Sequence, residues 1–143
     1  MKRLFIPGPL PGLNEIINAK GNAYGGGASA YTKMKKQWCG TIALLAHSQG
    51  IKTIGSGHFT YLFRERDKRR DPSNIAAGAV KLIEDGLQTA GLLENDGWKQ
   101  VLGFSHHFMV DAKHPGCTVF VFSSGLERQE AIDLDDTARS MRA

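Results

Sequence analysis

The chain has 143 residues, of which 41% are hydrophobic and 22% are charged. That length suits one domain with its own core, and no stretch approaches the roughly 20 apolar residues of a membrane span. Only three apolar residues separate the basic start of the chain from Pro7, too few for a secretory signal. We therefore expect one soluble domain, residues 1–143, in the cytoplasm. Cys39 and Cys117 lack metal-binding spacing, so we expect both to be reduced and buried.

The charge of +4 is unevenly distributed along the chain. Residues 1–70 carry twelve Lys and Arg against three Asp and Glu, whereas residues 71–143 carry six against eleven. Cations hold a phosphate backbone and acids hold metal ions, so this division suits a nuclease. The alternative is a basic domain whose charges are simply solvated.

The first half of the chain predicts a strand and a long helix. Residues 2–6 are apolar enough for a strand, and the proline-rich stretch that follows ends it in a loop. A triple glycine, 25–27, predicts a flexible break. Apolar residues then recur at helical spacing over 30–48. The opposite face of this helix presents Lys33 and Lys36, as a phosphate-binding stripe or as ordinary solvated lysines.

The second half alternates strands and a helix. Residues 58–63 predict a strand, and apolar residues at i, i+3 and i+4 predict a helix from Pro72 to near Gly91. Two further strands, 101–109 and 117–122, flank a turn-rich loop and predict a hairpin. A charged tail, 126–143, is helical or flexible. The resulting order, β-α-β-α-β-β-α, indicates an α/β (α+β) domain with a mixed sheet covered by helices. Trp38 and Trp98 are expected in the core.

Asp71 follows a run of five cations within seven residues: Arg64, Arg66, Lys68, Arg69 and Arg70. One interpretation is a helix N-terminal acid paired with an arginine. The other is a metal ligand inside a cationic groove, because Mg²⁺ takes carboxylate oxygens together with substrate phosphate. Asp96 beyond the helix would supply a second carboxylate.

These residues resemble the RusA family of phage-type Holliday junction resolvases. The resemblance rests on Arg70-Asp71-Pro-Ser-Asn74, then Asp85-Gly86-Leu87, Ala90-Gly91 and Asn95-Asp96, and covers roughly the middle third of the chain. Asn95-Asp-Gly-Trp98 also looks like forms found in phages of Gram-positive bacteria. The resemblance implies a homodimer that binds four-way junctions in a bacterial host cell and acts in DNA recombination and repair. It also implies magnesium, with manganese as a possible substitute, and paired nicks in strands of like polarity.

By this resemblance the essential aspartates of the family fall on Asp71 and Asp96, and Asp85 is a further candidate metal ligand. The second aspartate of the family falls on Ser73, whose hydroxyl cannot replace an anionic ligand. The catalytic lysine falls on Ala77, and Lys81, one turn further along the same face, could substitute for it. The residues expected to bind DNA are Arg66, Lys68, Arg69, Arg70, Asn74, Lys33 and Lys36.

The helix of about 15 residues spans roughly 22 Å and separates Asp71 from Asp96. The two acids can share a cation only if the loop after the helix turns back, or if a dimer supplies them from different subunits. Because Ser73 replaces an acid, a relative that binds branched DNA without cutting is the alternative function. A structural protein whose basic half contacts another protein is the third, and it predicts no salt-dependent affinity for DNA.

Overall fold

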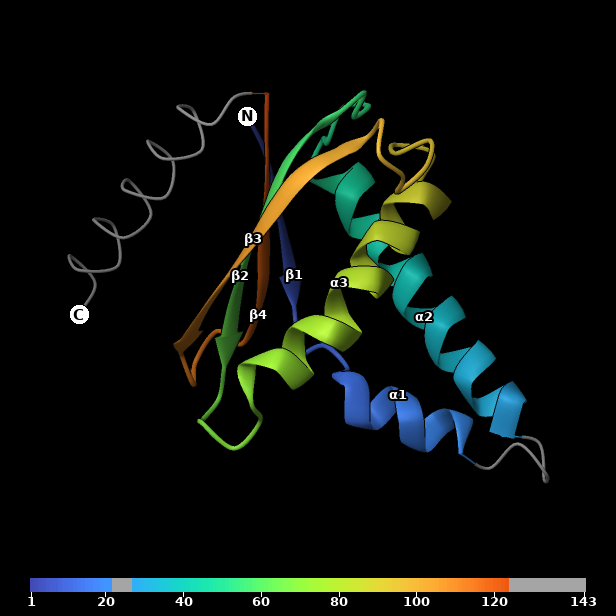
Figure 1. Ribbon diagram of the computed structural model, residues 1–143, viewed down its shortest axis with the longest axis vertical. Helices are drawn as coiled ribbons and strands as arrows, with labels where there is room; N and C mark the ends of the chain where they lie inside the picture. Colours follow the sequence, from blue (N-terminus) through green and yellow to red (C-terminus); the bar gives the residue numbers. More distant parts are fainter. Residues whose placement is uncertain (22–26, 124–143) are drawn as a thin grey trace.

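One mixed sheet of four strands carries three helices on one of its faces (Figure 1). The computed structural model describes residues 1–21 and 27–123. In chain order, the elements are β1 (Lys2–Pro7), α1 (Leu13–Lys20), α2 (Gly27–Ser48), β2 (Gly57–Glu65), α3 (Pro72–Thr89), β3 (Val101–Val110) and β4 (Gly116–Phe122). The sheet order is β1-β4-β2-β3, with β2 and β3 parallel and the other neighbours antiparallel. This confirms the α+β fold class and a mixed sheet covered by helices.

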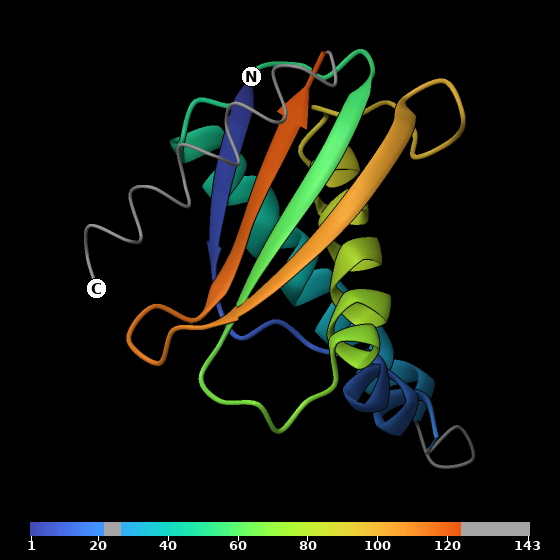
Figure 2. The same ribbon diagram turned by 60° about the vertical axis from the view of Figure 1, so that its left-hand side comes forward.

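All four predicted strands and both predicted helices are present, but the predicted hairpin is wrong. β4 lies between β1 and β2, so β3 and β4 are not neighbours (Figure 2). The reason lies in burial: every residue of β4 is buried, whereas β3 alternates between half-buried and exposed positions. A central place for the apolar strand removes more apolar surface from water. α3 then forms the crossover that joins the parallel pair β2 and β3.

The helix α1 was not predicted from the sequence, where residues 14–24 have a mixed pattern. None of its eight residues is buried, so the sequence carries little apolar periodicity there. Its first turn is instead completed by polar contacts, in which the Gly12 N–H donates to Glu15 Oε2 at 3.1 Å. The Asn14 N–H donates to Asn74 Oδ1 on α3 at 2.9 Å, 60 residues away in the chain. A helix held by such distant partners cannot be read from local sequence alone.

The core fills the space between the sheet and the helices. Phe59, Tyr61 and Phe63 project from β2 into it and are at most 1% exposed. Trp38 packs against this core, as expected, but Trp98 is 98% exposed, so its predicted burial is wrong. The two cysteines, one on α2 and one on β4, are buried and reduced, which confirms their prediction.

No helix in the described ranges is long and apolar enough to cross a membrane. The predicted tail at 126–143 and the first two glycines of the predicted break at 25–27 lie outside the described residues, whereas Gly27 opens α2.

We expect Gly78→Ala to lower the free energy of unfolding by about 1–3 kcal/mol, because α1 begins against this point of α3. A Cβ on Gly78 would lie 2.7 Å from the Leu13 nitrogen and collide with the Gly12 backbone. The matched control is Gly40→Ala on α2, where a Cβ meets nothing within 4 Å. That substitution should stabilise the helix by up to about 1 kcal/mol. Urea denaturation measures the change in the free energy of unfolding, which should be a decrease for Gly78→Ala and an increase for Gly40→Ala. Equal changes in both variants would contradict the packing of α1 against α3.

Candidate functional site

Lys81 on α3 holds two carboxylates from different parts of the chain. Its Nζ lies 3.1 Å from Asp85 Oδ1, one turn further along the helix, and donates a hydrogen bond to Asp96 Oδ2 in the loop after α3. Lys35 of α2 approaches the second oxygen, Asp85 Oδ2, at 3.2 Å. Together with Glu84, these residues form what we call the acid–lysine cluster: Lys35, Lys81, Glu84, Asp85 and Asp96.

The loop after α3 turns back along the helix, and this brings Asp96 to Lys81. Gly91, at φ +74°, adopts the left-handed conformation that ends the helix. The N–H groups of Leu92 and Leu93 both donate to the Leu87 carbonyl, which reverses the chain. The loop therefore doubles back within one chain, but it brings Asp96 to Lys81 and not to Asp71. The expected arrangement, with Asp71 and Asp96 around one cation, is not formed within the chain.

Asp71 stands apart from the cluster. It occupies the N-cap position of α3, is exposed, and makes no side-chain capping bond. Lys81 lies ten residues further on, about 15 Å along the helix at 1.5 Å per residue. The structure thus brings the predicted ligands Asp85 and Asp96 to one cation but leaves Asp71 at the opposite end. Over residues 1–21 and 27–123, no three Asp, Glu, His or Cys side chains lie close enough together to hold a metal ion.

The charges of the cluster are strongly coupled. The hydrogen bond from Lys81 lowers the pKa of Asp96 and raises the pKa of Lys81 well above its ordinary value. The bond to Asp85 likewise raises the pKa of Lys35. Asp96 is therefore ionised at neutral pH, and the Lys81 ammonium group lies between it and Asp85. Two carboxylates around one cation match the donor set that Mg²⁺ takes when phosphate and water complete its coordination.

Glu84 is a further member of the cluster, and no sequence motif indicated it as a site residue. Its side chain is 9% exposed, and burial, followed by the charge of Asp96, raises its pKa to about 7. The buried hydroxyl of Tyr61, which has no hydrogen-bond partner among the described residues, lies close enough for the Glu84 charge to raise its pKa further. An acid on the apolar face of α3, next to Leu82 and Ile83, was the available signal for a buried carboxyl.

Two of the residues expected to bind DNA make structural contacts instead. The Arg70 guanidinium donates to both oxygens of Glu65 at 2.8 and 3.0 Å, to the Leu10 carbonyl at 2.8 Å, and to Glu15 at 3.2 Å. Its side chain is only 20% exposed. Asn74, as described above, accepts the backbone N–H at the start of α1. These partners lie up to 60 residues away in sequence, so local charge could not reveal them.

The other expected cations remain on the surface. Arg66, Lys68 and Arg69 are exposed in the loop between β2 and α3, where Arg69 also lies 3.5 Å from Asp67. Lys33 and Lys36 are exposed on α2. On α3, Ser73, Ala77 and Lys81 are all exposed at i, i+4 and i+8, which agrees with the expected common face.

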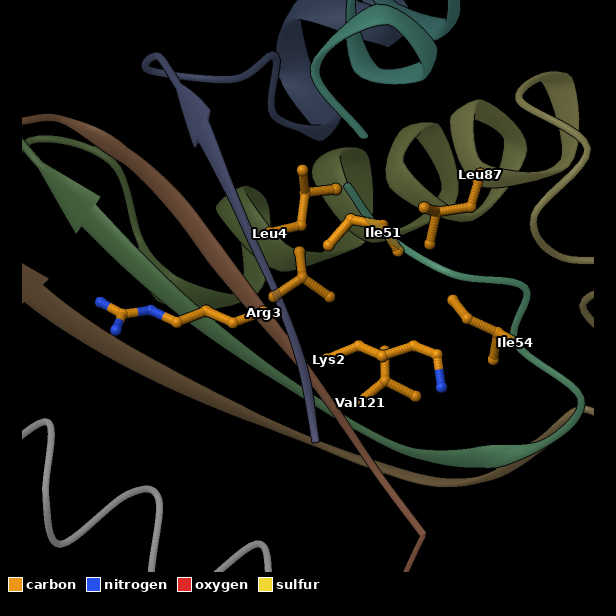
Figure 3. Close-up of a pocket in the computed structure, with 8 residues that line it drawn as sticks. Lys2, Arg3, Leu4, Ile51, Ile54, Leu87 and Val121 are labelled. Carbon is orange, nitrogen blue, oxygen red and sulfur yellow. The ribbon is translucent and has the colours of Figure 1, made fainter. Parts of the chain in front are cut away.

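A shallow pocket elsewhere is apolar and carries no convergent polar groups. It lies against β1 and β4 beside the segment that joins α2 to β2 (Figure 3). Its lining residues are Lys2, Arg3, Leu4, Ile51, Ile54, Leu87, Val119 and Val121. None of the acid–lysine cluster lines this pocket.

We expect the stability of the metal-free protein to fall as pH rises through about 7, because Glu84 must ionise while buried. The pKa of Glu84 in the folded protein lies above the ordinary value of 4.5. Its contribution to the free energy of unfolding is therefore complete below pH 4.5 and is lost above about pH 7. Glu84→Gln should therefore gain about 3 kcal/mol relative to the wild type between pH 4.5 and 8.5. Urea unfolding in a chelator at both pH values measures this. Glu94→Gln, at an exposed residue, is the control. If the stability of Glu84→Gln changed with pH as that of the wild type does, Glu84 would not be the source of the pH dependence.

No family model matches the chain, and the search of curated proteins finds no relative.

Proposed function

We propose that the protein is a magnesium-dependent endodeoxyribonuclease that cuts four-way or otherwise branched DNA. The observation that carries the proposal is the convergence of Asp85 and Asp96 on the ammonium group of Lys81, whose side chain is 60% exposed. By the resemblance to RusA resolvases, it acts as a homodimer that makes paired nicks in DNA recombination and repair, in the cytoplasm of a bacterial host cell. Manganese is the expected substitute metal.

The chemistry of the cluster supports hydrolysis of a phosphodiester. A divalent ion bound by Asp85 and Asp96 would supply Lewis acidity at a phosphoryl oxygen and a hydroxide nucleophile. The Lys81 ammonium is exposed and bonded to Asp96, so it lies where a scissile phosphate would need a positive charge. Lys35 orients Asp85 from α2 through a contact of 3.2 Å with its second oxygen. In this proposal Asp96 and Lys81 do the work that the family assigns to its late aspartate and lysine.

The exposed cations supply the DNA contacts. Arg66, Lys68 and Arg69 lie in the loop just before Asp71, about 15 Å along α3 from Lys81. One strand of B-DNA spans that length with four or five phosphates, at 3.4 Å each. A strand held by this loop therefore reaches the acid–lysine cluster. Asp71 would lie between the two, close to the bound backbone.

We expect Asp96→Asn to lower junction cleavage by about 100-fold or more while leaving junction binding unchanged, because it removes one metal-binding charge. The assay compares nicks and gel mobility on a synthetic four-way junction with magnesium, with manganese and with a chelator. Glu94→Gln removes the same charge two residues away and should cut normally. The proposal fails if Asp96→Asn cuts at the wild-type rate, or if the wild type leaves the junction whole with both metals.

Substitutions of two adjacent arginines should separate DNA binding from folding. Arg69→Ala should weaken DNA affinity and lower the slope of log affinity against log salt by about one, because Arg69 is 90% exposed. Arg70→Ala should instead destabilise the fold by about 3 kcal/mol, because it leaves Glu65 without its cation. Salt titrations of binding and urea unfolding distinguish the two. A stable Arg70→Ala protein with weak DNA affinity would reverse these roles.

A protein that binds branched DNA without cutting is the second candidate. It is favoured by Ser73, which stands where the family has an acid, and by the distance of Asp71 from the cluster. The same junction assay separates the candidates, because a binder shifts the junction and leaves every strand intact with either metal.

A further inference from the structure

Three aromatic side chains follow one another along β3, on the face of the sheet that carries the helices. We call Phe104, His106 and Phe108 the aromatic row. The parallel register places each of them beside one of the three core aromatics of β2, and registered neighbours share a face of the sheet. Figure 2 shows β3 as the outermost strand of the sheet. The aromatic row therefore continues the aromatic core of β2 out to the protein surface.

The rings of the aromatic row are held by the core and yet are accessible. Phe108 stacks on Phe63 with ring centroids 5.4 Å apart, and His106 packs at an angle against Tyr61 at 5.7 Å. Phe104 stacks on His106 at 5.3 Å. Phe104 is nevertheless 59% exposed and Phe108 is 37% exposed. A rigid aromatic surface binds a flat ring at little entropic cost, because its own side chains are ordered beforehand.

The surface around the aromatic row is uncharged. β3 contains no Asp, Glu, Lys or Arg. Burial, followed by the neighbouring His107, lowers the pKa of His106, so its imidazole is mostly neutral near neutral pH. A phosphate group would meet no cation on this strand. The faces of nucleobases, in contrast, stack on aromatic rings whatever the base.

The two ends of β3 lie at the two parts of the proposed DNA path. β3 begins five residues after Asp96, and its last residue, Val110, pairs with Glu65, directly before the exposed cations of the loop between β2 and α3. Tyr61 connects the aromatic row to the acid–lysine cluster, because its ring contacts His106 and its pKa is raised by the charges of Glu84 and Asp96. A strand that runs from the cation loop to the cluster thus passes beside the aromatic row.

We propose that the aromatic row stacks the unpaired bases of a DNA strand, so that the protein prefers DNA in which about four nucleotides beside the cut are single-stranded. The row spans about 13 Å along the strand, which matches four nucleotides at roughly 3.4 Å each. Bases within a duplex stack on one another, so only an unpaired segment offers its faces to the protein. The position beside the cut rests on the proposed function, whereas the stacking is measured without metal and without cutting.

Thymidine oligonucleotides that contain a single 2-aminopurine test the stacking directly, in the presence of a chelator. The wild type should bind them and quench the fluorescence of the probe, as aromatic stacking does. Phe104→Leu should weaken binding by about 10-fold or more and remove most of the quenching, whereas Phe104→Trp should retain both. The matched control is Leu102→Ala, at a residue of β3 that is 52% exposed and not aromatic, and it should bind as the wild type does.

A gapped duplex separates base stacking from phosphate contacts. The wild type should bind a duplex with a gap of four nucleotides about 10-fold or more tightly than the intact duplex of the same sequence. Phe104→Leu should lose this preference and keep the wild-type slope of log affinity against log salt. Arg69→Ala, in contrast, should weaken the binding of both duplexes equally and lower that slope by about one.

Equal affinity of the wild type for the two duplexes, or an unchanged preference in Phe104→Leu, would overturn the proposal. A change in the solution mass of Phe104→Leu with its DNA affinity intact would also overturn it, because the aromatic row would then be a contact between proteins. Cutting is decided separately. A protein that nicks junctions but lacks the preference keeps the proposed function and loses the stacking surface, and a protein that stacks bases but never nicks loses only the proposed function.

Discussion

The contact between Lys81 and its two carboxylates is the interaction on which the candidate site depends. Asp85 and Asp96 both contact Lys81, and without this cation the two carboxylates would repel each other and drive the loop after α3 away from the helix. Lys81 lowers the pKa of Asp96 and also contacts Asp85, which Lys35 approaches from α2, and burial raises the pKa of Glu84 to about 7. Under the proposed function, the same two carboxylates would exchange the ammonium group for a metal ion.

Local patterns predicted the elements well and their long-range contacts poorly. The apolar spacing of α3 located that helix, and Lys81 with Asp85 is an i, i+4 pair that any helical register brings together. Asp96 joined them only through the reversal at Gly91, whose left-handed backbone the sequence allowed but did not require. The hairpin prediction was wrong because sequence order suggests adjacent strands as neighbours, whereas burial placed β4 in the centre of the sheet.

The number of charges in a segment did not predict the contacts of each charged residue. Arg69 and Arg70 look alike in the sequence, yet one is exposed and the other is bonded to Glu65, Glu15 and the Leu10 carbonyl. Those partners come from three separate segments, so only the folded chain distinguishes an exposed cation from one that joins β2, α1 and the loop after β1. Acids behave in the same way: Asp71 headed the predicted metal site by its position in the motif, and the fold left it at the far end of α3.

The side-chain amide of Gln49 limits where further strands can join the sheet. By satisfying the Phe5 backbone, it removes one of the two places where the sheet could grow. A chain with two open edges would polymerise into a fibril, strand upon strand. Within the described residues, the bonds of Gln49 to Phe5 therefore cap the middle of β1, so β3 is the edge strand without such a side-chain cap.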